Sequence, residues 1–124
     1  IMDLIKVGFD TLVEAGYQPE AAFFQCVYES KLIVDLLLSK GLEGMRSAIS
    51  DTAEWGGYLA GPQVVNLESR QAMKQMLERI QDGTFASEWM DEAAVGSKLR
   101  AFRDLERGNG IDKVLSNLRE HGLD

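Results

Sequence analysis

Histidine and cysteine are almost missing from this chain of 124 residues, which contains one of each, His121 and Cys26. A single cysteine excludes an internal disulfide, and one histidine and one cysteine are too few for a structural zinc site, which takes four such ligands. Because the only histidine lies close to the end of the sequence, nucleophilic catalysis by a Ser–His or Cys–His pair is not expected within the body of the domain.

Long hydrophobic runs are also lacking. The longest, LIVDLLL at residues 32–38, has seven residues and includes Asp35, whereas a membrane-spanning helix takes about 20 apolar residues. No signal-peptide pattern is present. We therefore expect a cytoplasmic protein with no membrane partner.

Positive charge is scarce, with 13 Lys and Arg against 20 Asp and Glu, which gives a net charge of −7. A surface that neutralises phosphates needs an excess of cations, so this charge argues against nucleic acid and anionic membranes as partners. Magnesium, or a protein with a basic patch, suits this charge better. The 45% hydrophobic content and the two prolines are typical of a folded chain, and the length fits one domain.

Apolar residues recur at intervals of three and four along the whole sequence, and the alternation typical of strands is not sustained anywhere. Glycines fall between the periodic segments, where they would end helices. The pattern predicts an all-α, single-domain protein of seven to eight helices without internal repeats. The predicted helices cover residues 2–15, 19–40, 42–48, 51 to 57 or 61, 67–82, 85–94, 98–107 and 110–122, with a loop at 61–66.

Several residues are predicted to set the ends of these helices. Pro19 suits a first helical turn, and helix caps are expected at Ser50 (with Asp51 and Thr52), Asn66, Thr84 and Ser97. Within helix 67–82 the apolar side chains share one face, which we expect to point inward. This face consists of Ala72, Met73, Met76, Leu77 and Ile80.

The predicted helix at 19–40 is apolar on two opposite sides, so we expect it to be central and buried. At about 100° per residue, Gln25 and Glu29 share one apolar stripe, one turn apart. A buried carboxylate is costly unless it gains a metal, a cation or good hydrogen bonds. The pair therefore has a ligand or catalytic role, or it makes an inter-helix hydrogen bond, or it lies exposed at the edge of a groove.

The second unusual segment is AISDTAEWGGYLAGP, at residues 48–62, where small, polar and aromatic residues crowd a helix start. Free N–H groups at such a start favour an anion or a polar substrate group. The alternative is an ordinary cap, in which Ser50 or Asp51 satisfies the first turn.

Three long strings carry a family resemblance: GFDTLVEAGYQPEAAFFQCVYESKLIVDLL, GLEGMRSAISDTAEWGGYLAGP and IQDGTFASEW. They closely resemble the C-terminal domain of ketol-acid reductoisomerase, and the likeness extends over residues 4–119. The resemblance implies that residues 1–124 form the knotted helical domain of that family. The Rossmann domain, which binds NADPH in the family and precedes the helical domain, is absent from this sequence.

The resemblance also implies an activity and partners. The family's enzyme converts acetolactate or acetohydroxybutyrate to a dihydroxy acid, such as 2,3-dihydroxyisovalerate, in valine and isoleucine biosynthesis. A Mg2+-promoted alkyl migration precedes reduction by NADPH. Because the site of the short-chain class forms between two subunits, we expect a homodimer with intertwined helices that binds a small acetohydroxy acid.

Carried onto this sequence, the family's second metal-ligating glutamate is Glu29, and the serine that touches substrate is Ser50; both are expected catalytic residues. The first glutamate of the pair falls on Gln25, whose neutral amide is a weaker magnesium ligand. The family's other Asp–Glu metal pair would precede residue 1. The turn at 108–110, GNG, also departs from the family.

Because of these departures, the sequence is compatible with more than one function. We expect no turnover by the chain alone, which lacks a nicotinamide-binding element. The alternative function is a non-catalytic dimerisation or knotted-fold module, natural, excised or designed. A third hypothesis is a metal- or small-molecule-binding domain without catalysis.

Overall fold

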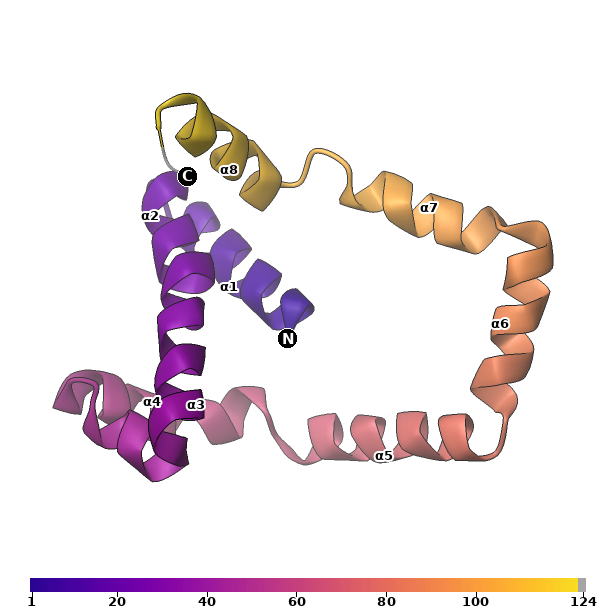
Figure 1. The fold of residues 1–124 in the computed structure, drawn as a ribbon, viewed down its shortest axis with the longest axis horizontal. Helices are drawn as coiled ribbons and strands as arrows, with labels where there is room; N and C mark the ends of the chain where they lie inside the picture. Colours follow the sequence, from indigo (N-terminus) through magenta and orange to yellow (C-terminus); the bar gives the residue numbers. More distant parts are fainter. Residues whose placement is uncertain (123–124) are drawn as a thin grey trace. The chain divides into compact units, whose positions relative to one another are not determined.

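The computed structural model describes residues 1–122, and over this range the chain forms helices and no strands (Figure 1), which confirms the all-α prediction. None of the helices in this range is long and apolar enough to cross a bilayer. The chain divides into two compact units, one made of Ile1–Ala48 with Arg107–Asp124 and the other of Ile49–Glu106. The two units are described in turn.

The first unit contains α1, α2, a π-helical turn η1, α3 and α8. As predicted, α1 ends before Gly16, whose φ of 91° lies in the left-handed region, and α2 begins with Pro19 as its first residue. The bounds are Met2–Glu14 for α1, Pro19–Phe23 for α2, Phe24–Tyr28 for η1, Glu29–Ser47 for α3 and Gly110–Glu120 for α8.

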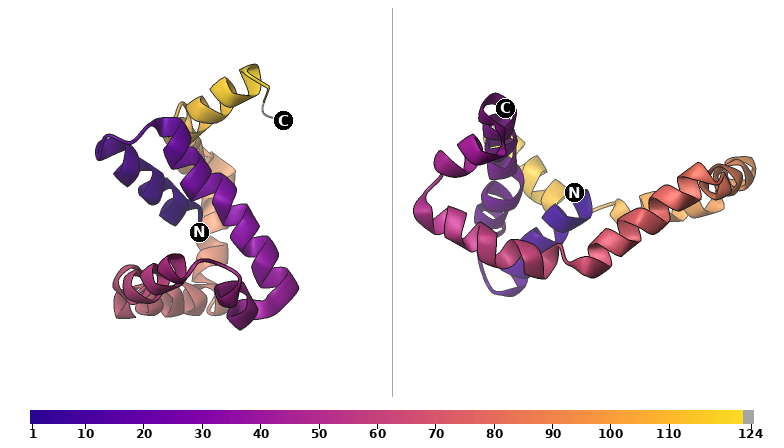
Figure 2. Two further views of the ribbon diagram at one scale, coloured as in Figure 1. Left: turned by 90° about the vertical axis from the view of Figure 1, so that its left-hand side faces the viewer. Right: turned by 90° about the horizontal axis from the view of Figure 1, so that it is seen from below.

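The core of the first unit forms where α1, α2 and α8 meet (Figures 1 and 2). Its buried side chains are Phe9 from α1, Ala22 and Phe23 from α2, and Val114 from α8. α8 is amphipathic and is capped by Asn109, whose Oδ1 accepts the N–H of Asp112 at 2.9 Å. Partly buried apolar side chains surround this core: Leu12, Val13, Cys26, Val27, Ile111, Leu115 and Leu118.

The predicted helix at 19–40 is a helical run of three elements, α2, η1 and α3. The predicted break at Gly41 is confirmed, because this residue has φ 70° and ψ 178°, and the chain beyond it turns helical again up to Ser47. The π-turn at Phe24–Tyr28 was not predicted. This turn includes Gln25, where it widens the helix, and α3 begins directly after it, at Glu29.

The expectation that this helix is buried along its length is wrong for the chain as it stands. Ala22 and Phe23 are buried, but Leu32, Val34 and Leu38 are exposed, and Leu38 retains 81% of its surface. The reason lies in what packs on the helix: α1 and α8 contact α2, and α1 also contacts η1, whereas α3 extends away from them. A periodic apolar pattern identifies the faces of a helix that could be buried. It does not show that another part of this chain packs against them.

The second unit contains α4 (Asp51–Val64), α5 (Leu67–Gln81), α6 (Thr84–Val95) and α7 (Ser97–Glu106). The predicted caps at the starts of α4 and α5 are confirmed. Ser50 Oγ accepts the N–H of Ala53 at 3.2 Å, and Asn66 Oδ1 accepts the N–H of Ser69 at 3.1 Å.

The predicted loop at 61–66 is wrong, because α4 continues through Pro62 to Val64. Proline lacks an N–H and removes one backbone hydrogen bond. Two neighbouring bonds hold the last turn nonetheless: Gln63 Nε2 donates to the carbonyl of Leu59 at 2.9 Å, and Val65 N–H donates to that of Gly61 at 2.8 Å. A proline this close to a helix end is tolerated.

Successive helices of the second unit contact each other at their joints. Arg79 of α5 forms an ion pair with Glu88 of α6, and Glu92 of α6 accepts the N–H of Leu99 in α7 at 2.8 Å. The predicted cap at Thr84 is wrong, since Gly83 holds the cap position.

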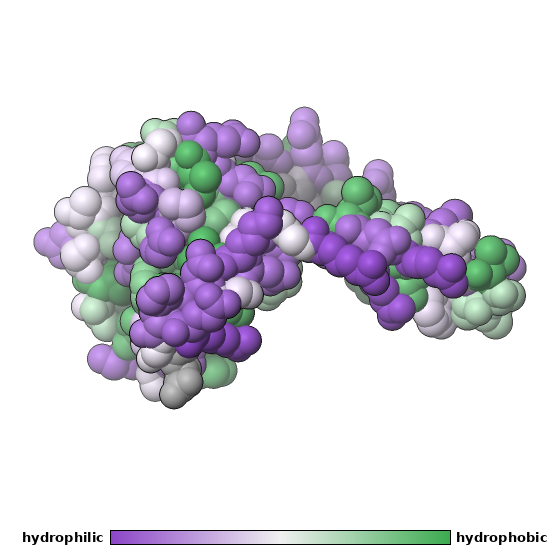
Figure 3. Space-filling view, turned by 90° about the horizontal axis from the view of Figure 1, so that it is seen from above, coloured by the Kyte–Doolittle hydropathy of each residue, from purple (hydrophilic) through white to green (hydrophobic). Residues whose placement is uncertain are grey.

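No residue of the second unit, all of whose residues are described, is buried. The predicted inward face of α5 is exposed, with 66% of Met73 and 52% of Leu77 accessible. In Figure 3 hydrophobic side chains reach the surface in several places. Helices α5, α6 and α7 contact one another only where one helix joins the next. No second layer of helices in this unit therefore packs against these side chains. Other exposed apolar residues of this unit include Trp55, Leu59, Phe85, Trp89, Met90, Phe102 and Leu105.

Candidate functional site

Gln25 lies within the π-turn η1, and Glu29 directly follows it. The backbone N–H of Glu29 donates to the carbonyl of Phe24, five residues back, where an α-helix would reach four residues back, to the carbonyl of Gln25. The two side chains are therefore one turn apart, as predicted, but this turn is π-helical and wider than an α-helical turn. π-turns of this kind are frequent at functional sites.

Both side chains are exposed, which is one of the positions that the spacing left open for the pair. At Gln25 the exposure reflects the side of the helix on which it lies, because η1 contacts α1 and its Cys26 and Val27 pack against the core. Of the alternatives that the spacing left open, an inter-helix hydrogen bond is not formed among the described residues. The other two alternatives do not exclude each other, because an exposed Gln25–Glu29 pair can also bind a ligand.

The cation nearest to Glu29 in sequence is engaged elsewhere. Lys31 Nζ lies 2.6 Å from Asp35 Oδ2, and this hydrogen bond raises the pKa of Lys31. Within residues 1–122 no ion pair joins Glu29 to a cation. Its carboxylate is therefore open to a cation from outside the chain.

The donor set of the pair fits part of a magnesium site. Mg2+ binds one or two carboxylates and keeps several waters, and the pair offers one carboxylate oxygen ligand from Glu29 and one amide oxygen from Gln25. No group of three or more His, Cys, Asp or Glu side chains suited to a metal occurs in the described range. The remaining ligands of such an ion would be waters or groups from another polypeptide.

Ser50 lies in the second unit, where it caps α4. Its Oγ accepts the N–H of Ala53 at 3.2 Å, so the ordinary-cap interpretation is confirmed. Because the oxygen acts as an acceptor in this bond, its own O–H is left to donate to another group. The residue is exposed, and Asp51 follows it in the first turn.

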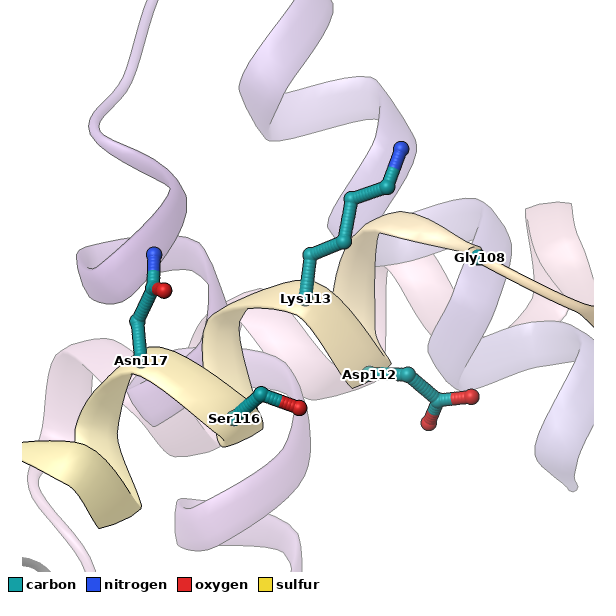
Figure 4. A pocket seen from close by; sticks show the side chains of 5 residues that line it. All are labelled: Gly108, Asp112, Lys113, Ser116 and Asn117. Atoms are coloured by element: carbon teal, nitrogen blue, oxygen red, sulfur yellow. The ribbon is translucent and has the colours of Figure 1, made fainter.

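The open hollow on α8 holds none of the predicted site residues (Figure 4). It has a volume of 570 Å³ and is lined by Gly108, Asp112, Lys113, Ser116 and Asn117. Asp112 is occupied by the helix cap, since it accepts a hydrogen bond from Asn109 Nδ2 at 2.8 Å. Lys113 and Asn117 extend to one side of the helix and Asp112 and Ser116 to the other (Figure 4), so these groups do not converge.

The fold and the exposed pair define an all-α domain that presents one carboxylate and one amide at a π-turn on its surface. Comparison with known families gives the identity of that domain. The family described as "Ketol-acid reductoisomerase, C-terminal domain" matches residues 1–122, and the chain belongs to this family.

A solved structure supports the same conclusion. The chain is similar to an NADH-preferring ketol-acid reductoisomerase from an uncultured archaeon, with 42% sequence identity and a TM-score of 0.91 over 96% of this chain. The match covers 36% of that protein, so the chain spans about a third of its length. The family resemblance read from the sequence is confirmed, while the roles of Gln25, Glu29 and Ser50 stay predictions.

Proposed function

We propose that the chain is the helical part of a Mg2+-dependent ketol-acid reductoisomerase, which rearranges and reduces acetolactate or acetohydroxybutyrate to a dihydroxy acid. The family match over residues 1–122 supports the reaction class. The observation that carries the proposal is the exposed Gln25–Glu29 pair, whose oxygens are free to bind a metal on the widened turn.

Glu29 and Gln25 would together hold one Mg2+. When bound, the ion would act as a Lewis acid that polarises a substrate oxygen. Glu29 supplies the only negative charge of the pair, and the neutral amide of Gln25 contributes a weaker ligand, because hard divalent cations favour charged oxygens. We therefore expect magnesium affinity below that of a pair of carboxylates.

Ser50 has a separate role in the proposal, as a substrate-binding residue. Its Oγ accepts the N–H of Ala53, which orients the hydroxyl. The O–H then donates a hydrogen bond to a substrate oxygen. Reduction needs a hydride from a nicotinamide cofactor, which we place on a Rossmann domain outside this sequence, so the 124-residue chain alone should not consume NADPH.

The proposed partner is a second copy of the chain, in a homodimer with intertwined helices and the family's knot. The lack of any buried residue in Ile49–Glu106 supports association, because a helical unit needs a buried apolar face to be stable. The same observation favours the second candidate function, a dimerisation module without catalysis.

Titration of the chain with acetolactate tests the proposed function, with binding followed by NMR in Mg2+ and in chelator. Ser50→Gly removes the hydroxyl while costing the helix cap only a few tenths of a kcal/mol. We expect Mg2+-dependent binding that Ser50→Gly weakens about fivefold, the value of one hydrogen bond. Ser47→Ala is the control, since Ser47 only bonds the carbonyl of Glu43. Association without binding of Mg2+ or acetolactate would favour the non-catalytic module.

A further inference from the structure

Three consecutive residue pairs, each four residues apart, begin within the π-turn. The middle pair is Gln25 and Glu29. One residue earlier, the rings of Phe24 and Tyr28 meet edge to face, with centroids 5.6 Å apart and an interplanar angle of 68°. One residue later, Ser30 Oγ donates a hydrogen bond to the carbonyl of Cys26 at 2.7 Å. In the sequence, the proposed ligand pair is thus preceded and followed by a pair of residues that are in contact.

Both flanking contacts are anchored to the core of the first unit. Phe24 also meets the buried ring of Phe23 edge to face, at 6.0 Å. Cys26 packs against the core, and its Sγ lies where a Cβ on Gly8 of α1 would be 3.4 Å away. Tyr28 and Ser30 precede and follow Glu29 in the sequence, and on a helix their side chains project to nearly opposite sides.

We propose that Tyr28 and Ser30 are positioning residues for a divalent cation held by Gln25 and Glu29; this inference rests on the proposed function. Neither Tyr28 nor Ser30 touches the ion. The aromatic contact and the hydroxyl contact each tie the segment that carries Glu29 back to the segment that carries Gln25. They fix the spacing of the two ligands before the ion arrives.

The widened turn is the physical reason why the contacts of Tyr28 and Ser30 would matter. In η1 the N–H of Glu29 no longer bonds the carbonyl of Gln25, so the α-helical bond that would hold these two residues in register is missing. Two exposed ligands lose conformational freedom when an ion orders them, and this loss reduces affinity. Ser30 and Tyr28 restrict the turn in advance, and so raise the affinity for the ion.

Mn2+ serves as the spectroscopic probe, with free Mn2+ measured by EPR in titrations of the full chain. We expect Ser30→Ala to weaken Mn2+ binding about three- to tenfold, the range for one lost hydrogen bond. Ser30→Thr keeps a hydroxyl that can bond the same carbonyl, so it should restore the affinity. Tyr28→Ala should weaken binding as well, and Tyr28→Phe, which keeps the ring, should not.

The matched control is Ser47→Ala, which removes the same type of bond, Ser47 Oγ to the carbonyl of Glu43 at 3.0 Å, from the far end of α3. A positioning role predicts unchanged Mn2+ affinity in this control. Melting temperatures in chelator separate positioning from folding, because a purely structural serine would lower the melting temperature and leave the affinity of the folded chain unchanged. That result for Ser30→Ala would overturn the inference.

Glu29→Gln distinguishes failure of this inference from failure of the proposed function. If Glu29→Gln loses Mn2+ affinity while Ser30→Ala and Tyr28→Ala keep it, the positioning role is wrong and the proposed function stands. If Glu29→Gln binds Mn2+ as the parent does, the metal role of the pair is wrong, and the positioning role is wrong with it.

Discussion

Gly110 lies against the ring of Phe9, so close that a Cβ added to Gly110 would be 2.6 Å from Phe9 Cε1. The ring is 2% exposed and cannot move aside. We expect Gly110→Ala to lower the free energy of unfolding by about 1–3 kcal/mol, the usual cost of overpacking. Urea denaturation followed by circular dichroism measures the change.

Gly56→Ala is the control for this substitution. Gly56 lies within α4, and a Cβ there would meet nothing within 4 Å. Alanine in a helix interior is favoured over glycine by up to about 1 kcal/mol, so this variant should be neutral or stabilised. Equal losses in the two variants would contradict the packing of α8 on α1.

Asp82 should make the stability of the second unit depend on acid pH. Its carboxylate accepts the backbone N–H of Thr84 at 2.8 Å at the start of α6, and this bond lowers the pKa of Asp82 below its usual value. A lowered pKa in the folded state means that the stabilisation is complete at neutral pH. It is lost as the pH falls from the ordinary carboxyl range through the folded pKa.

Melting curves of the parent and of Asp82→Asn, recorded between neutral and acid pH, test this dependence. The parent should melt at a higher temperature than the variant at neutral pH, because a negative charge near the start of a helix is favourable. The difference should shrink on acidification. A difference that stays constant with pH would mean that the charge of Asp82 contributes nothing.

Association should depend on the exposed face of α5. Leu77→Asp places a charge within this face, next to Met73, Met76 and Ile80, and we expect it to reduce both assembly and helical content, because burial of this face would otherwise stabilise the unit. Gln75→Asp adds the same charge on the opposite side of the helix and should have little effect. Light scattering coupled to size exclusion measures the mass; a compact parent monomer of 13.8 kDa would contradict the proposed dimer.

The helix ends could be predicted from the sequence because their causes are local. Gly16 supplies a left-handed residue after α1, Pro19 fits the first turn of α2, and Asn66 caps α5 with its own side chain. The end of α4 could not be predicted in this way, since Pro62 and the glycines before it indicate a loop. The helix survives there through the bond from Gln63 to Leu59.

Burial could not be predicted, because a periodic pattern identifies an apolar face but not the surface that covers it. Leu38 and Met73 belong to such faces and are exposed in the single chain. The candidate site was found in the sequence through Gln25 and Glu29. The π-turn there is defined by a backbone hydrogen bond from Glu29 to Phe24, for which residue spacing gives no signal.

The central claim, that Gln25 and Glu29 form part of a metal site, predicts how Gln25→Glu responds to magnesium. Because both positions are exposed, two carboxylates four residues apart should destabilise the metal-free chain only slightly, by about 0.2–0.5 kcal/mol. The second carboxylate should raise the affinity for Mg2+. A ligand that binds only the folded state stabilises it more, at a given concentration, the higher its affinity is.

The most direct measurement is the melting temperature of the parent and of Gln25→Glu, each in chelator and in millimolar Mg2+. We predict a slightly lower value for Gln25→Glu in chelator and a larger rise for it than for the parent when Mg2+ is added. Identical responses of the two proteins to Mg2+ would contradict the account, because the pair would then be a solvent-exposed stretch of helix without affinity for the ion.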